Sequence, residues 1–264
     1  MRLLLRVLPT VLVLALAGCG GDDGGSGSGG DLASKEPKAI LDDVSAALGK
    51  VRSYHVEGTQ SDKDGRSTLT GDVSAGGDVR FRMTVAESKL DLIAVGDRTY
   101  MKADRAFWSS RGGAAGPRIA NLLADRWVIA PDEAGGELRG SLDQLLPRNL
   151  AYCVTRTSGT VSKRGTEKLD GHDVVVLTDK GDKPGTSPGE MYVSTTGPAL
   201  PLRVVQTGPE KPGGTNDPRC GDDDSSTTAS DVRLSDFDEP VDVKAPPNPL
   251  DLTTLSGAGS SSVS

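Results

Sequence analysis

The chain has 264 residues, a formal net charge of −7 at neutral pH and only 3% aromatic residues. An acidic chain without a basic block has little attraction for phosphates, so nucleic acid is excluded as an expected partner. Residues 35–250 are enough for one domain with a substantial core. Because aromatic residues are scarce, that core must consist mainly of Val, Leu, Ile and Ala.

The N-terminus has the pattern of an export signal. Two arginines precede an apolar stretch at 7–17, which is shorter than the roughly 20 residues that a membrane-spanning helix needs. The stretch ends in LAGC at 16–19, which resembles the lipobox of bacterial lipoproteins. The resemblance implies that residues 1–18 are a lipoprotein signal peptide and that Cys19 is lipidated and anchors the chain to a membrane. The alternative is an ordinary secretory signal in which the cysteine occurs by chance.

A polar segment and a helix follow. Residues 19–34 are rich in Gly, Ser and Asp and offer little apolar surface to bury, so we expect a flexible tether. Residues 34–52 then predict an amphipathic helix with Ser34 as its N-cap. Its apolar side is formed by residues at three- and four-residue spacing, namely Ile40, Leu41, Val44, Ala47, Leu48 and Val51.

From Ser53 onward apolar and polar residues alternate, which is typical of strands with one face on the core. The sequence DKDG at 62–65 predicts one hairpin turn, and Gly-Asp at 96–97 predicts another. The segment AFWSS at 106–110 is expected to continue or close the second strand pair. This half of the chain therefore predicts a meander of antiparallel strands.

Two short helices interrupt the strands. One is expected to begin at Pro117, and the other is expected to be capped by Ser141 and stopped by Pro147. Alternation resumes in the segments that follow residue 159. About ten strands and three helices are predicted in total.

Export changes the expectation for the remaining cysteines. Outside the cytoplasm Cys153 and Cys220 are expected to form a disulfide. Cys220 lies in a stretch rich in Pro and Gly, which a disulfide would fix to the body of the domain. The alternative is that the two cysteines bind a metal or that one is a reactive thiol, but neither cysteine has a His or a further Cys near it in the sequence.

A family resemblance is visible in the second run of strands. The segments GTEKLDGHDVVVLTD, GEMYVSTTGPALPLRVVQTG and DVRLSDFDEPVDVKAPP, with the lipobox and ILDDVSAALGKVRSYHVEG before them, resemble the LppX/LprG group of bacterial lipoproteins, in the LolA/LolB-like fold class. The resemblance implies an α+β fold: a curved antiparallel β half-barrel of about ten strands whose concave face is covered by helices. It implies a single LppX/LprG-like lipid-binding domain over 35–250, and we expect a disordered tail over 251–264.

The function that the resemblance implies is that of a membrane-anchored lipoprotein outside the cytoplasm, on the outer face of the cell membrane. It would bind or carry acyl-chain-bearing molecules (a lipid, a glycolipid or a lipoprotein) in an apolar cavity. If the strand alternation is correct, the lipid cavity is lined by apolar residues of the first strands, with three residues of the first inserted helix on a lid. These are Val56, Leu69, Val73, Val79, Phe81, Met83, Val85, Leu90 and Leu92, with Ile119, Leu122 and Leu123 on the lid.

No catalytic or metal-binding pattern is convincing. The GxSxG match at 185–189 lies in a loop before a strand and lacks the strand–turn–helix context of a nucleophile elbow. The two histidines, His55 and His172, each lie in an alternating segment and do not form a zinc motif. We therefore expect no enzyme, no cofactor and no metal, and a monomer. The alternative function is a non-enzymatic envelope sensor or scaffold that binds a protein partner.

Overall fold

The structure is a computed structural model that describes residues 29–63, 65–111, 113–214, 217, 219–220 and 227–252. The expected signal peptide (1–18), the lipidation site Cys19 and the tail beyond 252 lie outside the described residues. No helix within the described ranges is both long enough and apolar enough to cross a membrane.

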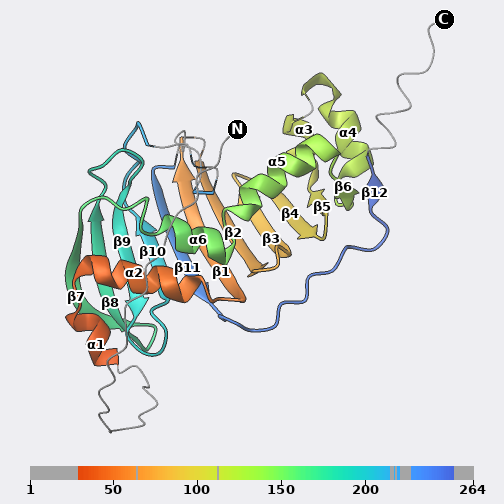
Figure 1. The fold of residues 1–264 in the computed structure, drawn as a ribbon. Helices are drawn as coiled ribbons and strands as arrows, with labels where there is room; N and C mark the ends of the chain where they lie inside the picture. Colours follow the sequence, from red (N-terminus) through yellow and green to blue (C-terminus); the bar gives the residue numbers. More distant parts are fainter. Residues whose placement is uncertain are drawn as a thin grey trace, which may run out of the picture.

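Among the described residues, twelve strands form one open sheet (Figure 1). The order across the sheet is β12-β6-β5-β4-β3-β2-β1-β11-β10-β9-β8-β7. All neighbouring pairs are antiparallel except β12 and β6. The strands are β1 (Ser53–Asp62), β2 (Gly65–Ser74), β3 (Val79–Val85), β4 (Ser88–Val95), β5 (Arg98–Ala103), β6 (Val128–Ile129), β7 (Val161–Leu169), β8 (His172–Lys180), β9 (Pro188–Ser194), β10 (Pro201–Gln206), β11 (Ala229–Ser235) and β12 (Leu250–Asp251).

The helices lie mainly on one face of this sheet. In Figure 1, α2, α6 and α5 follow one another across the strands, while α3 and α4 lie beyond β4 and β5. The α-helices in the described part of the chain are α1 (Gly29–Ser34), α2 (Pro37–Leu48), α3 (Arg105–Arg111), α4 (Gly116–Leu123), α5 (Asp132–Asp143) and α6 (Pro147–Cys153), with a 3₁₀ turn at Gly113–Ala115.

Two apolar clusters join the helices to the sheet. Leu142 of α5 and Leu146 pack on the first strands, where Phe81 is 1% exposed. Ile40 and Val44 of α2 pack on β8 and β9 together with Ala151 of α6. The aliphatic face that the sequence predicts for the helix at 34–52 is thus the face that is buried.

Gly71 shows how closely the first strands are packed. A Cβ at this position would lie 2.3 Å from Cδ1 of Phe81 and 2.3 Å from the carbonyl oxygen of Arg80. Gly71 and Phe81 are cross-strand partners in the β2–β3 register. The Phe81 ring therefore covers the glycine backbone, and a side chain at Gly71 would displace it.

The fold confirms the α+β class and corrects several details. The segment at 106–110 is not a strand but part of α3, where the backbone N–H of Phe107 donates to Asp104 Oδ1 at 2.8 Å. Pro147 begins α6 instead of stopping a helix, because the first turn of a helix does not need its N–H. The helix that we expected Ser141 to cap begins earlier, at Asp132, and contains Ser141.

The chain enters the domain differently from our expectation. Ser34 ends α1, and Glu36 occupies the N-cap of α2 without a side-chain hydrogen bond. Residues 29–34 of the expected tether form α1. Nζ of Lys163 on β7 donates to the carbonyl oxygen of Ala33 at 2.6 Å, which fixes this segment beside the β7 edge.

We predict that Gly71→Ala lowers the free energy of unfolding by about 1–3 kcal/mol, because the added methyl group overpacks the contact with Phe81. Gly136→Ala in α5 is the matched control, since a Cβ there has nothing within 4 Å. Alanine favours the helix, so this variant should gain about 0.5–1 kcal/mol. Urea denaturation measures both, and a neutral Gly71→Ala would contradict the packing.

Candidate functional site

A cavity of about 290 Å³ lies between the helices and the strands of the second half of the sheet. Its apolar wall combines residues of α2, the segment after α6, and strands β7 to β10. Cys220 and polar residues of β8 and β9 and their connections complete its outline. The lining includes Leu41, Val154, Val161, Leu177, Met191, Val204 and Cys220.

A row of half-buried apolar side chains runs across the sheet to this cavity. Its members are cross-strand partners in consecutive strand pairs, with Gly58 of β1 in the middle. From β4 to β9 it covers six interstrand spacings, or about 29 Å. We call it the half-buried row: Leu90, Met83, Leu69, Val232, Val204 and Met191.

The adjacent row, one step along the same face, is fully buried. It consists of Leu92, Phe81, Val56 and Leu234, with Gly71 between Phe81 and Val56. Leu138, Leu145 and Leu150 of the helix layer pack against the cluster that contains this row, as do members of the half-buried row. The half-buried row is thus the margin of the core, where helix cover ends.

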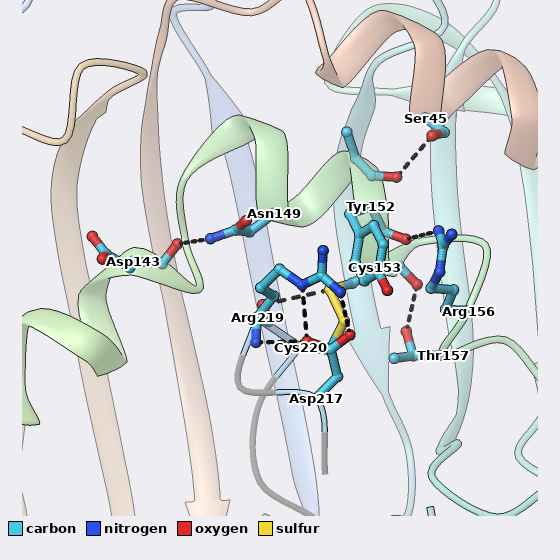
Figure 2. The surroundings of a disulfide bond; sticks show 11 residues. Ser45, Asp143, Asn149, Tyr152, Cys153, Arg156, Thr157, Asp217, Arg219 and Cys220 are labelled. Carbon is cyan, nitrogen blue, oxygen red and sulfur yellow. Dashed lines mark hydrogen bonds and ion pairs between the residues drawn. A yellow bond between two sulfur atoms is a disulfide. The ribbon is translucent and has the colours of Figure 1, made fainter. Parts of the chain in front are cut away.

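A disulfide, drawn in Figure 2, lies at one side of the cavity, and its Cys220 is part of the cavity lining. It joins Cys153, the last residue of α6, to Cys220, 67 positions later in the chain. The loop that contains Cys220 is thereby fixed to the end of a helix that packs on α2. Ser45 of α2 completes this connection, because its Oγ donates to the carbonyl oxygen of Ala151 at 2.7 Å.

Tyr152 holds the same loop by a second interaction. Its ring lies between two guanidinium groups, with Cζ of Arg156 at 3.7 Å and Cζ of Arg219 at 3.6 Å from the ring centroid. Arg219 donates in turn to both carboxylate oxygens of Asp217, at 2.9 and 2.8 Å (Figure 2). These hydrogen bonds hold the pKa of Asp217 far below its ordinary value. The Asp217 carboxylate therefore stays charged well into the acid range.

The structure places the residues that the sequence assigns to a cavity in three environments. Val56, Val73, Val79, Phe81 and Leu92 are buried on the helix-covered face. Leu69, Met83 and Leu90 belong to the half-buried row. Val85 lies at the end of β3 and is 42% exposed. These residues share one face of the sheet, as the alternation predicts, and their contact with a ligand stays a prediction.

The residues expected on a lid lie elsewhere. The helix that carries them, α4, packs against α3 at the edge of the sheet and not over the concave face (Figure 1). Leu122 is 65% exposed, Ile119 is half-buried and Leu123 is buried. The helices over the concave face are α2, α5 and α6.

The cavity residues of the second half of the chain were missed by the sequence analysis. Leu177, Met191 and Val204 lie in segments whose alternation predicts strands, so a signal existed. The sequence did not show that β11 pairs with β1 and joins both halves into one sheet. Among the described residues no group of three or more potential metal ligands occurs.

The similarity of this chain to known proteins is a similarity of fold. Neither protein-family models nor curated proteins give a match. The crystal structure of LprF from Mycobacterium bovis matches 79% of this chain and 96% of that chain, with a TM-score of 0.51 and 16% identity. The Mycobacterium tuberculosis lipoprotein LppX matches 78% of this chain and 97% of that chain, with a TM-score of 0.49 and 16% identity. The Pseudomonas aeruginosa MucA/MucB complex matches 80% of this chain and 58% of that chain, with a TM-score of 0.32 and 16% identity.

The likeness to LprF shows that this chain has the LppX/LprG-type lipoprotein fold. At 16% identity it shows the fold alone. A fold does not fix a function, which depends on the side chains of the site.

We predict that the double variant Cys153→Ser/Cys220→Ser loses about 4 kcal/mol of unfolding free energy, because the unfolded chain regains the freedom of a long closed loop. Denaturant unfolding of the parent after reduction should give the same midpoint as the double variant. Unchanged stability in both samples would show that the Tyr152 stack alone holds the loop.

Proposed function

We propose that this chain is a membrane-anchored lipoprotein of the cell envelope that binds or carries molecules bearing an acyl chain. The observation that carries the proposal is the half-buried row, which runs in register across the sheet and ends at the cavity between Leu41 and Met191. The activity is binding by enclosure and not catalysis.

The row has the chemistry that an acyl chain requires. Its side chains are Leu, Met and Val, and each is partly exposed, so that a guest can still remove apolar surface from water. Burial of hydrocarbon contributes about 0.8 kcal/mol per methylene, which offsets what the molecule loses on leaving a bilayer. The two methionines adapt their unbranched side chains to guests of different shape.

The binding position that we propose differs from the one that the sequence favours. Phe81, Val79 and Val56 are packed beneath α5 and Leu146, so a guest there would have to displace core side chains. At Met191, Val204 and Leu177 space already exists. We therefore place the acyl chain at the β8–β10 end first, with the half-buried row as its continuation.

Membrane anchoring through Cys19 completes the proposal. The lipobox supports lipidation, and α1 begins at Gly29, ten residues after Cys19. A diacylglyceryl cysteine supplies at least two chains, which is what stable anchoring takes. The protein would then act outside the cytoplasm, at the outer face of the cell membrane.

The proposal predicts that the purified full chain with Cys19→Ser yields lipid on organic extraction and mass spectrometry and takes up a fluorescent fatty acid. Met191→Trp should weaken uptake tenfold or more, because the indole fills the cavity, while cooperative melting persists. Ser162→Trp on the exposed side of β7 adds the same indole away from the cavity and should bind like the parent.

A clean extract without fatty-acid uptake would overturn the carrier proposal. That result would favour the alternative of an envelope sensor or scaffold that binds a protein partner. Equal loss of uptake in Met191→Trp and Ser162→Trp would place the guest outside the cavity.

A separate prediction concerns the anchor. In cells fed labelled palmitate the native chain should take up the label and fractionate with membranes, whereas Cys19→Ser should remain unlabelled because it lacks the acceptor thiol. Cys220→Ser is the matched control and should keep the label. Labelling of Cys19→Ser would contradict the anchor assignment.

A further inference from the structure

The α3–α4 hairpin is a separate projection at one edge of the sheet. It consists of α3, the 3₁₀ turn at Gly113–Ala115 and α4, and it lies beyond β4 and β5 in Figure 1. No residue of α3 is buried. The two helices nevertheless pack closely, because a Cβ at Gly116 would lie 2.2 Å from the carbonyl oxygen of Ser109. The hairpin is therefore an ordered structure with little cover.

Its surface presents apolar side chains that the fold does not bury. Leu122 is 65% exposed, and among the described residues it is one of two large apolar side chains classed as exposed. Phe107, Trp108 and Ile119 are half-buried. The rings of Phe107 and Trp108 meet edge to face at 5.3 Å between centroids. Aromatic and leucine side chains on a projecting helical surface are typical of segments that lie in a membrane interface.

The hairpin is also a basic segment of an acidic protein. Residues 105–123 include Arg105, Arg111 and Arg118 and no Asp or Glu, whereas the whole chain has a net charge of −7. Within the described ranges none of these three arginines forms an ion pair with a carboxylate. Arg105 donates to Asn121 Oδ1 at 2.7 Å, and Arg111 stacks over Phe107 at 5.2 Å.

Two arginines on the outer face of the sheet differ in this respect. Arg80 pairs with Asp72, and Arg82 pairs with Asp91 at 3.2 Å. Their charge is neutralised within the molecule. The charge of the hairpin stays available for an external anion.

We propose that the α3–α4 hairpin docks on the surface of an anionic lipid bilayer. Leu122 and the Phe107–Trp108 pair enter the interface, and Arg111 and Arg118 contact lipid phosphates. The net charge of −7 of the whole chain opposes a broader contact with the same surface. A bilayer fits better than a protein groove, because the feature is a projection that combines exposed apolar side chains with unpaired arginines.

The position of the hairpin relative to the N-terminal end of the domain would determine how the sheet is oriented on the membrane. α1, where the chain enters the domain, lies beside β7, and α3–α4 lies at the opposite end of the sheet (Figure 1). If the N-terminus is also anchored, the two contacts orient the sheet along the membrane. The docking itself does not depend on lipidation or on acyl-chain binding.

Vesicle binding tests the proposal with the full chain carrying Cys19→Ser. The variant Arg111→Gln/Arg118→Gln is compared with Lys63→Gln/Arg66→Gln, which removes two exposed cations near the β1–β2 turn. Residues 1–28 are the same in all samples, so their contribution to binding cancels. Vesicles of phosphatidylcholine mixed with phosphatidylglycerol are compared with vesicles of phosphatidylcholine alone.

We expect the hairpin variant to lose roughly fivefold in affinity for the anionic vesicles for each arginine removed, while the Lys63/Arg66 control binds like the parent. The loss should shrink as salt is added. Leu122→Asn should also weaken binding, at low and at high salt, because the interaction that it removes is apolar. In a Trp127→Phe background Trp108 is the one remaining tryptophan, and its fluorescence should be quenched by spin-labelled lipid in anionic vesicles.

Equal affinities of the hairpin variant and the Lys63/Arg66 control would overturn the proposal, as would an unquenched Trp108. Cross-linking of position 122 to an envelope protein without vesicle binding would also overturn it and indicate a protein partner. Fatty-acid uptake by the hairpin variant should equal that of the parent, so failure of this proposal is distinguishable from failure of the carrier function.

Discussion

The constraint on which the structure depends is that an open sheet must bury one face with few helices. α2, α6 and α5 cross the strands in a line (Figure 1). A helix is about 10 Å wide, whereas the ten residues of β1 extend about 33 Å. One line of helices therefore covers only part of each strand. Phe81, Val73 and Val56 lie in the covered part and are buried, and the next row along the strands is left half-buried.

This partial cover explains where a guest could bind. In the first half of the sheet Leu142 and Leu146 pack in one buried cluster with Phe81 and leave no free space there for a guest. In the second half α2 packs on β8 and β9, and the Cys153–Cys220 disulfide holds a loop beside the remaining space. The disulfide thus does more than stabilise a polar loop, because its Cys220 lines the cavity. A fold without this loop would leave Met191 and Val204 at an open margin.

The face without helices is stabilised by a different kind of side chain. Asp91 lies between Arg82 and Lys102, and Arg203 makes two hydrogen bonds to Asp231. Each exposed pair contributes little free energy by itself, but together the pairs keep this face soluble. The edge strand β7 is almost entirely exposed and carries several charged side chains, which discourages pairing with another sheet. The α3–α4 hairpin combines arginines without a carboxylate partner among the described residues with the exposed Leu122, and this combination is the basis for the proposed docking surface.

The sequence alone determined the features that depend on local periodicity and turn chemistry. The alternation in β1 to β5 and β8 to β11, the turns at 62–65 and 96–97 and the apolar side of α2 are all set by neighbouring residues, and the structure confirms them. Helices α3 and α6 were not predicted. Asp104 caps α3 and Pro147 begins α6, but an aspartate or a proline at such a position is equally compatible with a turn, so the tertiary structure decides whether a helix follows. Which apolar residues are buried and which are half-exposed was decided by the tertiary structure. That outcome depends on the β1–β11 pairing and on the width of the helix layer, and neither is a property of any short segment.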